Sequence, residues 1–86
     1  MSLFIVSYDL RKPNYTESDY ENLWGELDSL GAKHIQDSVW GLRSELESSE
    51  SLFDKLWAHM HSKDRLLVVR TDGYKNINGI NRVDSI

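Results

Sequence analysis

Hydrophobic positions along the chain change from a strand-like to a helix-like spacing. Residues 3–9 are rich in β-branched and aromatic side chains and precede the turn signal Pro13–Asn14, which predicts a buried first strand. Apolar residues then recur every three or four positions from Tyr20 to Leu30, as on one face of a helix. Gly31 follows directly, so it predicts the end of that helix.

The start of this first helix has two candidate registers. Ser18 with Glu21 matches the capping-box pattern, in which a side chain at each of two positions binds the backbone of the other. Thr16 with Asp19 matches the same pattern two residues earlier. Either pair places the helix start between the turn signal and the apolar stripe.

Downstream of the first helix, the pattern predicts two strands, a second helix and a last strand. Residues 33–36 and 39–43 carry β-branched and aromatic side chains and are joined at Asp37–Ser38, which is typical of a hairpin. Ser48 begins a helix with its apolar residues on one face. Residues 65–70 form a short apolar strand with charged ends.

The element order βαββαβ predicts an α+β fold of the ferredoxin-like type. Because each crossover is right-handed, both helices fall on one face of a four-stranded antiparallel sheet, with the first and third strands central. Trp24 and Trp57 would then lie between the helices and the sheet. Residues 1–70 form the predicted domain. The polar tail 71–86 is expected to be either an extra C-terminal strand, exchanged across a dimer, or a disordered segment.

Composition limits the class of protein. A chain of 86 residues has a small core and, in this fold, one uncovered sheet face, which together favour a homodimer. The absence of cysteine excludes disulfides, thiolate metal sites and a cysteine nucleophile. The net charge of −4 gives no overall attraction to nucleic acid, which would need a local basic patch or a partner. The start of the chain resembles neither a signal peptide nor a membrane span, so we expect a cytoplasmic protein without a membrane partner.

Asp9 is the residue that most suggests chemistry. It ends a buried strand where the chain enters an open loop, so its carboxylate would be both held and accessible. An aspartate in such a place more often serves a turn or a cap. His59 and His61, with Asp64 nearby, are also metal-ligand types, but positions two apart on a helix point to different faces. A position at a helix C-terminus is the simpler interpretation of both histidines.

Three segments resemble a known family in order and spacing. Residues 5–10 read Ile-Val-Ser-Tyr-Asp-Leu, residues 36–40 read Gln-Asp-Ser-Val-Trp and residues 64–68 read Asp-Arg-Leu-Leu-Val. Together they resemble the Cas-two-like small CRISPR-associated nucleases. The chain is similar, more closely still, to the SinR-like group of small bacterial proteins. The virulence-associated protein D ribonucleases are similar in architecture.

This resemblance implies a ferredoxin-like homodimer in which two copies of Asp9 face each other. Their carboxylates would hold Mg²⁺ or Mn²⁺ for phosphodiester hydrolysis, which makes Asp9 the expected catalytic and metal-binding residue. The resemblance therefore implies a metal-dependent endonuclease that acts on RNA or DNA in antiviral defence or as a toxin. The residues expected to contact nucleic acid or support the site are Ser7, Tyr8, Arg11, Lys12 and Ser38.

A second hypothesis stays open, because Glu45, Glu47 and Glu50 would repel phosphates and so argue against a duplex-DNA surface. It is a non-catalytic dimer that keeps the fold and serves protein partners or regulation. The nuclease requires two Asp9 carboxylates roughly 4 to 6 Å apart with basic groups around them, and the interaction module does not.

Overall fold

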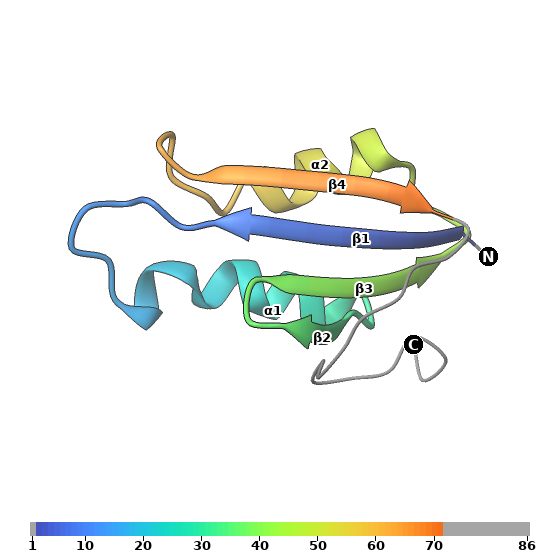
Figure 1. The fold of residues 1–86 in the computed structure, drawn as a ribbon, viewed down its shortest axis with the longest axis horizontal. Coiled ribbons are helices and arrows are strands. Elements are labelled where there is room, and N and C mark those ends of the chain that lie inside the picture. Colours follow the sequence, from blue (N-terminus) through green and yellow to red (C-terminus); the bar gives the residue numbers. More distant parts are fainter. Residues whose placement is uncertain (1, 72–86) are drawn as a thin grey trace.

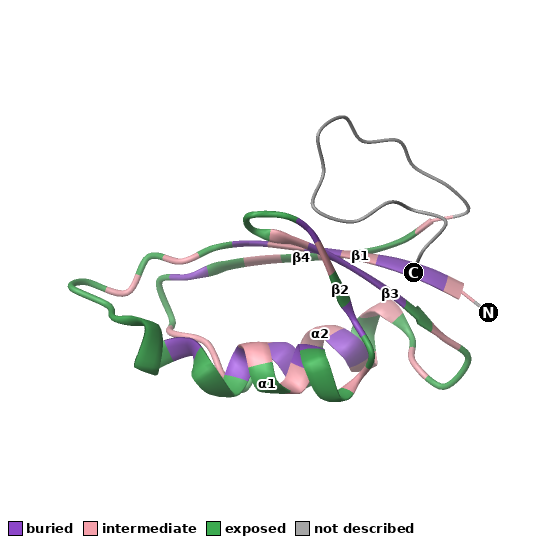
Figure 2. Ribbon diagram, turned by 90° about the horizontal axis from the view of Figure 1, so that it is seen from below, coloured by how far each residue is buried: buried purple, intermediate pink, exposed green. Residues whose placement is uncertain are grey.

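The computed structural model describes residues 2–71 and arranges them in two layers, a four-stranded antiparallel sheet and two helices on one of its faces (Figures 1 and 2). The strands are β1 Ser2–Asp9, β2 Lys33–Gln36, β3 Val39–Ser44 and β4 Arg65–Thr71. The helices are α1 Glu21–Ser29 and α2 Ser49–Trp57, and the 3-10 turn η1 Glu17–Tyr20 leads into α1. The predicted ferredoxin-like α+β fold is confirmed. The strand expected in the tail lies outside the described residues.

The strand order is β2-β3-β1-β4, so the first and third strands are central, as the sequence predicts. β1 pairs antiparallel with β3 on one side and with β4 on the other. Its last residue, Asp9, is still paired with Arg65 of β4. A strand held by neighbours is a rigid support for a side chain at its end. The short edge strand β2 is less regular, with a register shift between His34 and Gln36.

The two helices cover the sheet because each has one apolar stripe. Leu23 and Leu27 of α1 and Leu52 and Leu56 of α2 are fully buried. These leucines pack against the strand residues that point toward the helices, which are Phe4, Val6, Tyr8, Trp40 and Leu42. Neither helix of the described region has the length and apolar character needed to cross a membrane.

The ends of the first helical segment follow local signals. Gly31 has a φ of +81°, a conformation that a Cβ atom makes costly. The N–H groups of Gly31 and Ala32 donate at 3.0 Å to carbonyls of the last helical turn. At the other end, Asp19 accepts the backbone N–H of Thr16 at 2.8 Å. The earlier of the two predicted registers is therefore used, and it begins η1.

The two tryptophans expected between the layers differ in position. Trp24 packs against the core, as predicted. Trp57 is the last residue of α2 and lies outside the core cluster, stacked on Phe53 with ring centroids 6.1 Å apart. Both rings of this stack are half-buried.

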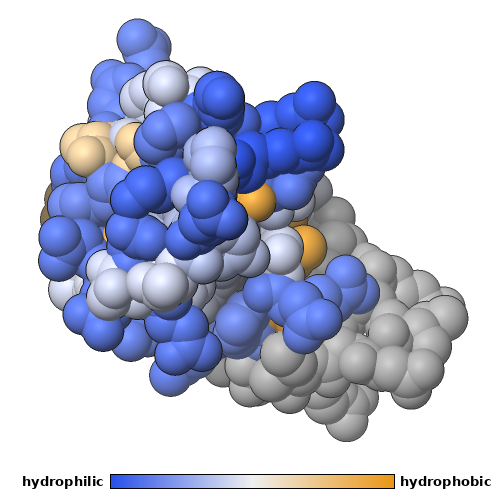
Figure 3. Space-filling model, turned by 90° about the vertical axis from the view of Figure 1, so that its left-hand side faces the viewer, coloured by the Kyte–Doolittle hydropathy of each residue, from blue (hydrophilic) through white to orange (hydrophobic). Residues whose placement is uncertain are grey.

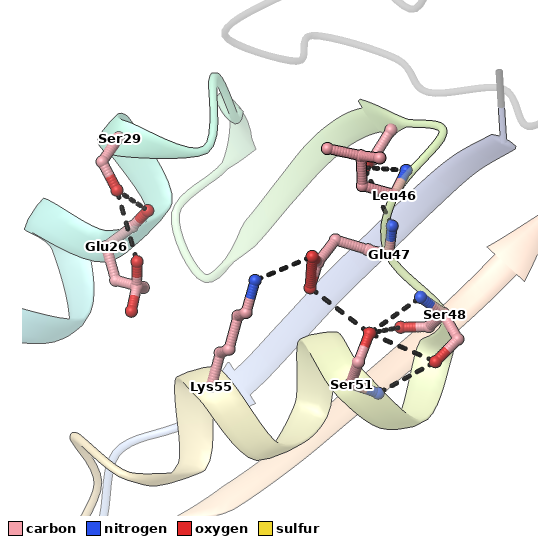
Figure 4. Close-up of polar contacts among 8 residues, drawn as sticks. Glu26, Ser29, Leu46, Glu47, Ser48, Ser51 and Lys55 are labelled. Atoms are coloured by element: carbon pink, nitrogen blue, oxygen red, sulfur yellow. Dashed lines mark hydrogen bonds and ion pairs between the residues drawn. The ribbon is translucent and has the colours of Figure 1, made fainter.

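The turn between β3 and α2 is held by polar contacts around Glu47 and Ser48 (Figure 4). The Ser44 hydroxyl accepts the N–H groups of Leu46 at 3.1 Å and Glu47 at 3.2 Å. The ammonium of Lys55 lies 2.8 Å from the Glu47 carboxylate, and the Ser48 hydroxyl caps α2. The Leu46 side chain projects from this ordered turn and is 94% exposed.

Candidate functional site

Asp9 lies on the open face of the sheet, opposite the helix layer. Because side chains alternate along a strand, Ser7 shares this face with Asp9. These two residues and Arg65 line an open pocket of about 160 Å³ at the end of β1. Figure 3 views the end of the molecule toward which β1 points, and hydrophilic residues dominate it.

Arg11 binds the Asp9 carboxylate directly. Its Nε atom lies 2.8 Å from Oδ2 of Asp9, and both side chains are 50% exposed. An ion pair with this exposure stabilises a protein by less than about 1 kcal/mol, because water solvates both charges well when they separate. Arg11 therefore orients the carboxylate and remains able to leave it.

The backbone of the loop after Asp9 is anchored by a buried carboxylate, that of Asp64. Its Oδ1 accepts the N–H groups of Arg11 at 2.6 Å and Lys12 at 3.2 Å. Its Oδ2 accepts the N–H of His61 at 2.8 Å. The Tyr20 hydroxyl lies 2.8 and 2.9 Å from the two oxygens. One carboxylate thus fixes the loop after β1, the end of η1 and the approach to β4.

These contacts decide the charge state of both buried groups. Burial by itself would raise the pKa of Asp64, but the donated hydrogen bonds outweigh it and hold that pKa below its ordinary value. Burial and the hydrogen bond to Asp64 raise the pKa of Tyr20 to about 12. Asp64 is therefore a carboxylate at neutral pH, and Tyr20 is a neutral donor to it.

The anchoring role of Asp64 is not predicted from the sequence. In the sequence, Asp64 appears only as a metal-ligand type near His59 and His61 and as the first position of the third matched segment. Its partners are up to 53 positions away in the chain, so no local pattern reveals them.

Tyr8, expected beside Asp9, lies on the other side of the sheet. Its ring is buried in the core, and its hydroxyl accepts the indole N–H groups of Trp24 and Trp40, each at 3.0 Å. The alternation of a strand requires this arrangement, because residue 8 must face away from residues 7 and 9. The phenol of Tyr8 therefore positions two indoles and does not face the Asp9 carboxylate.

Lys12 also turns away from Asp9. Its ammonium forms an ion pair with Asp19 and lines a cleft on the helix side of the molecule. Ser38, in contrast, lies near the end of β1, because its carbonyl accepts the N–H of Tyr8 at 3.1 Å. Ser38 is exposed there, next to the strand end that carries Asp9.

The expected site residues thus separate into two groups. Those at the Asp9 end of the sheet are Ser7, Arg11 and Ser38, and those directed elsewhere are Tyr8 and Lys12. Arg65 joins the first group, although the sequence did not single it out.

His59 and His61 line the same cleft as Lys12, which has a volume of about 330 Å³. The expectation that they point to different faces of a helix is wrong, because α2 ends at Trp57, before either of them. His59 Nε2 lies 3.4 Å from a carboxylate oxygen of Glu26, and His61 Nδ1 accepts the N–H of Lys63 at 3.1 Å. Both histidines therefore have structural partners.

The metal expected at Asp9 would need ligands beyond one chain. Within residues 2–71, no three side chains of metal-ligating type lie close enough to hold an ion. Asp9 alone offers one carboxylate, a hard oxygen ligand of the kind that Mg²⁺ and Mn²⁺ accept. A metal ion at Asp9 would therefore take its remaining ligands from water, a phosphate or a second copy. No protein-family model matches the chain.

Proposed function

We propose that the protein is a Cas-two-like, metal-dependent endonuclease that acts as a homodimer on RNA or DNA, in the cytoplasm and in a defence or toxin role. One observation carries this proposal. Asp9 is a half-exposed carboxylate at the end of a central strand, on the sheet face opposite the helices; it forms an ion pair with Arg11 and shares its pocket with Arg65, its pairing partner on β4. A carboxylate flanked by cations suits the joint binding of a metal ion and a phosphate.

Exposed apolar side chains on β4, on the sheet face opposite the helices, support the homodimer. On β4, Leu67 is 59% and Val69 is 40% exposed, and both lie on the face that carries Asp9. Apolar side chains gathered on one exposed face gain from a partner surface, and most small oligomers are two-fold symmetric. A two-fold contact pairs each surface with itself, so docking through this face with the axis near the end of β1 would bring the Asp9 residues of two copies together.

The residues around Asp9 would divide the work of phosphodiester hydrolysis. A divalent cation bound between two carboxylates lowers the pKa of a bound water and offsets negative charge on the phosphate. Arg11 and Arg65 would hold phosphate oxygens by charge-assisted hydrogen bonds. The hydroxyl groups of Ser7 and Ser38 would add neutral donors at the same strand end.

Cleavage of labelled RNA, single-stranded DNA and duplex DNA with Mg²⁺ or Mn²⁺ tests the proposal. We expect Asp9→Asn to reduce the rate by about 100-fold or more, since it removes a charge on which metal binding depends. Asp28→Asn is the matched control, because it removes the same charge from the exposed surface of α1 and should leave the rate unchanged. Equal rates for wild type and Asp9→Asn would refute the catalytic role of Asp9.

A mixing experiment tests whether both copies of Asp9 are needed. Wild type and Asp9→Asn chains are unfolded together in equal amounts and refolded, which gives about one quarter wild-type dimers by random pairing. A two-Asp site predicts activity near one quarter of the wild-type value. Activity near one half would mean that each chain works alone.

The second candidate is a non-catalytic interaction module, and the β3–α2 turn favours it. Leu46 is held out in solvent by an ordered turn beside the acidic residues Glu45 and Glu50. An exposed apolar side chain on a rigid turn suits a protein partner with an apolar pocket and a basic rim. A protein that forms dimers but cleaves no nucleic acid with either metal would favour this candidate.

A further inference from the structure

We propose that Arg11 links metal binding to phosphate binding at Asp9: it pairs with Asp9 in the free protein and transfers to a substrate phosphate when a cation binds. This inference rests on the proposed metal-dependent function. It assigns to Arg11 a positioning role and predicts that its removal changes metal affinity and nucleic-acid affinity in opposite directions.

The first argument is competition for one carboxylate. Arg11 Nε lies 2.8 Å from Oδ2 of Asp9, so the guanidinium already offsets the negative charge of the expected metal ligand. A divalent ion at Asp9 would be repelled by a guanidinium at this distance, and the repulsion is twice that between two single charges. Metal binding therefore favours any arrangement in which Arg11 moves away from Asp9.

The second argument is that the Arg11 side chain can move while its backbone stays in place. The Arg11 N–H donates to the Asp64 carboxylate at 2.6 Å, and Asp64 is only 6% exposed. The guanidinium itself is half exposed, and its pairing with Asp9 is weak in water. A change of side-chain rotamer is thus enough to release Asp9, with no movement of the loop.

The third argument is the chemistry of the released group. A guanidinium has five N–H donors in a planar fork that matches phosphate oxygens. The Arg11 side chain donates to Asp9 through Nε, and its Nη donors have no hydrogen-bond partner among residues 2–71. A phosphate next to the metal attracts both the ion and Arg11, so each ligand should strengthen binding of the other.

Lys12 provides a matched comparison within the same loop. Its backbone N–H is also held by Asp64, but its ammonium pairs with Asp19 and not with Asp9. Arg11→Gln and Lys12→Gln therefore remove the same charge from adjacent positions. A general effect of net charge would appear in both variants, whereas competition for Asp9 would appear in the first alone.

The experiment measures Mn²⁺ binding by the electron paramagnetic resonance signal of the free ion, with and without a short phosphorothioate oligonucleotide that resists cleavage. Without oligonucleotide, we expect Arg11→Gln to bind Mn²⁺ about three- to tenfold more tightly than wild type. Lys12→Gln should stay within about twofold of wild type, and Arg11→Lys, which keeps the charge, should show a smaller gain than Arg11→Gln. The oligonucleotide should bind Arg11→Gln more weakly and raise its Mn²⁺ affinity by a smaller factor.

The outcomes separate this inference from the proposed function. If Mn²⁺ binds wild type and is lost in Asp9→Asn, but Arg11→Gln binds it no more tightly than wild type, the role of Arg11 is refuted and the metal site stands. If wild type and Asp9→Asn bind Mn²⁺ equally, the metal site itself is refuted, and the inference with it. Equal gains in Arg11→Gln and Lys12→Gln would reduce the effect to net charge and also refute the inference.

Discussion

The hydroxyl of Tyr20 lies 2.8 and 2.9 Å from the two carboxylate oxygens of Asp64, and both residues are buried. The contact joins the end of η1 to the start of β4, which are 44 positions apart in the chain. Because the same carboxylate also holds the backbone of Arg11, the Asp9 loop depends on a group outside the open face. Stability and the geometry of the candidate site are therefore connected through Asp64.

Replacing Asp64 by Asn should destabilise the protein in a way that depends on pH. The charged carboxylate accepts several hydrogen bonds, so we expect a loss of about 1.5–3 kcal/mol at neutral pH. The pKa of Asp64 is lowered on folding, which means that its contribution is complete above the ordinary value of about 3.9 and is lost as pH falls through the lowered pKa. Urea denaturation at several pH values measures both effects.

The difference in stability between wild type and Asp64→Asn should therefore shrink as the solution becomes acidic. Glu21→Gln, at an exposed position in the first turn of α1, is a control for general charge effects. A wild-type advantage over Asp64→Asn that grows toward acid pH would contradict the argument.

Tyr20 provides the corresponding test in alkaline solution. Burial and the Asp64 carboxylate raise its pKa to about 12. Its contribution to stability is complete below the ordinary tyrosine pKa of about 10 and is lost as pH rises through the raised value. Absorbance at 295 nm should show one tyrosine that ionises near pH 12 in wild type, and Tyr20→Phe should lack this step. A wild type in which every tyrosine ionises near pH 10 would show that the contact does not form.

Two glycines at the first helix should respond to alanine in opposite directions. Neither has an atom within 4 Å of the position that a Cβ would take, so steric crowding affects neither. Gly31 has a φ of +81°, and Gly31→Ala should cost about 1–2 kcal/mol of unfolding free energy. Gly25 lies inside α1, where alanine should add about 0.5–1 kcal/mol. Thermal unfolding of both variants measures this, and a shift of the same sign in both would be evidence against the assigned helix end.

Tyr8→Phe should act on the core. The change keeps the ring but removes the oxygen that accepts the N–H groups of Trp24 and Trp40. Two partly or fully buried donors would lose their partner, at a cost of about 1–3 kcal/mol for each one that water cannot reach. Urea denaturation gives the stability, and the indole N–H resonances of both tryptophans should shift. Unchanged resonances would mean that the phenol is not their acceptor.

The fold could be predicted because its signals are local and repeated, whereas the site depends on distant contacts. The spacing of Leu23 and Leu27 predicts a helix whatever its tertiary surroundings. Gly31 marks the end of that helix, also without a tertiary partner. The burial of Tyr8 was also available from the alternation of a strand, once Asp9 was assigned to the open face. The role of Asp64 could not be predicted in this way, because it arises from partners that only the folded chain brings together.

The homodimer can be tested on the face that carries Asp9. Leu67 is 59% exposed at the centre of β4, and Leu67→Lys would place two charges in a two-fold interface formed by this face. Full burial of an exposed leucine contributes about 1.5–3 kcal/mol, and Leu67 is already partly buried, so losing both should weaken dimerisation by at least about tenfold. Leu46→Lys makes the same change on the β3–α2 turn, where the side chain is 94% exposed. Sedimentation equilibrium should show a dimer for wild type and Leu46→Lys and a monomer for Leu67→Lys. If Leu46→Lys is the monomer instead, the copies associate through the turn, and two Asp9 residues cannot share a metal across the open face.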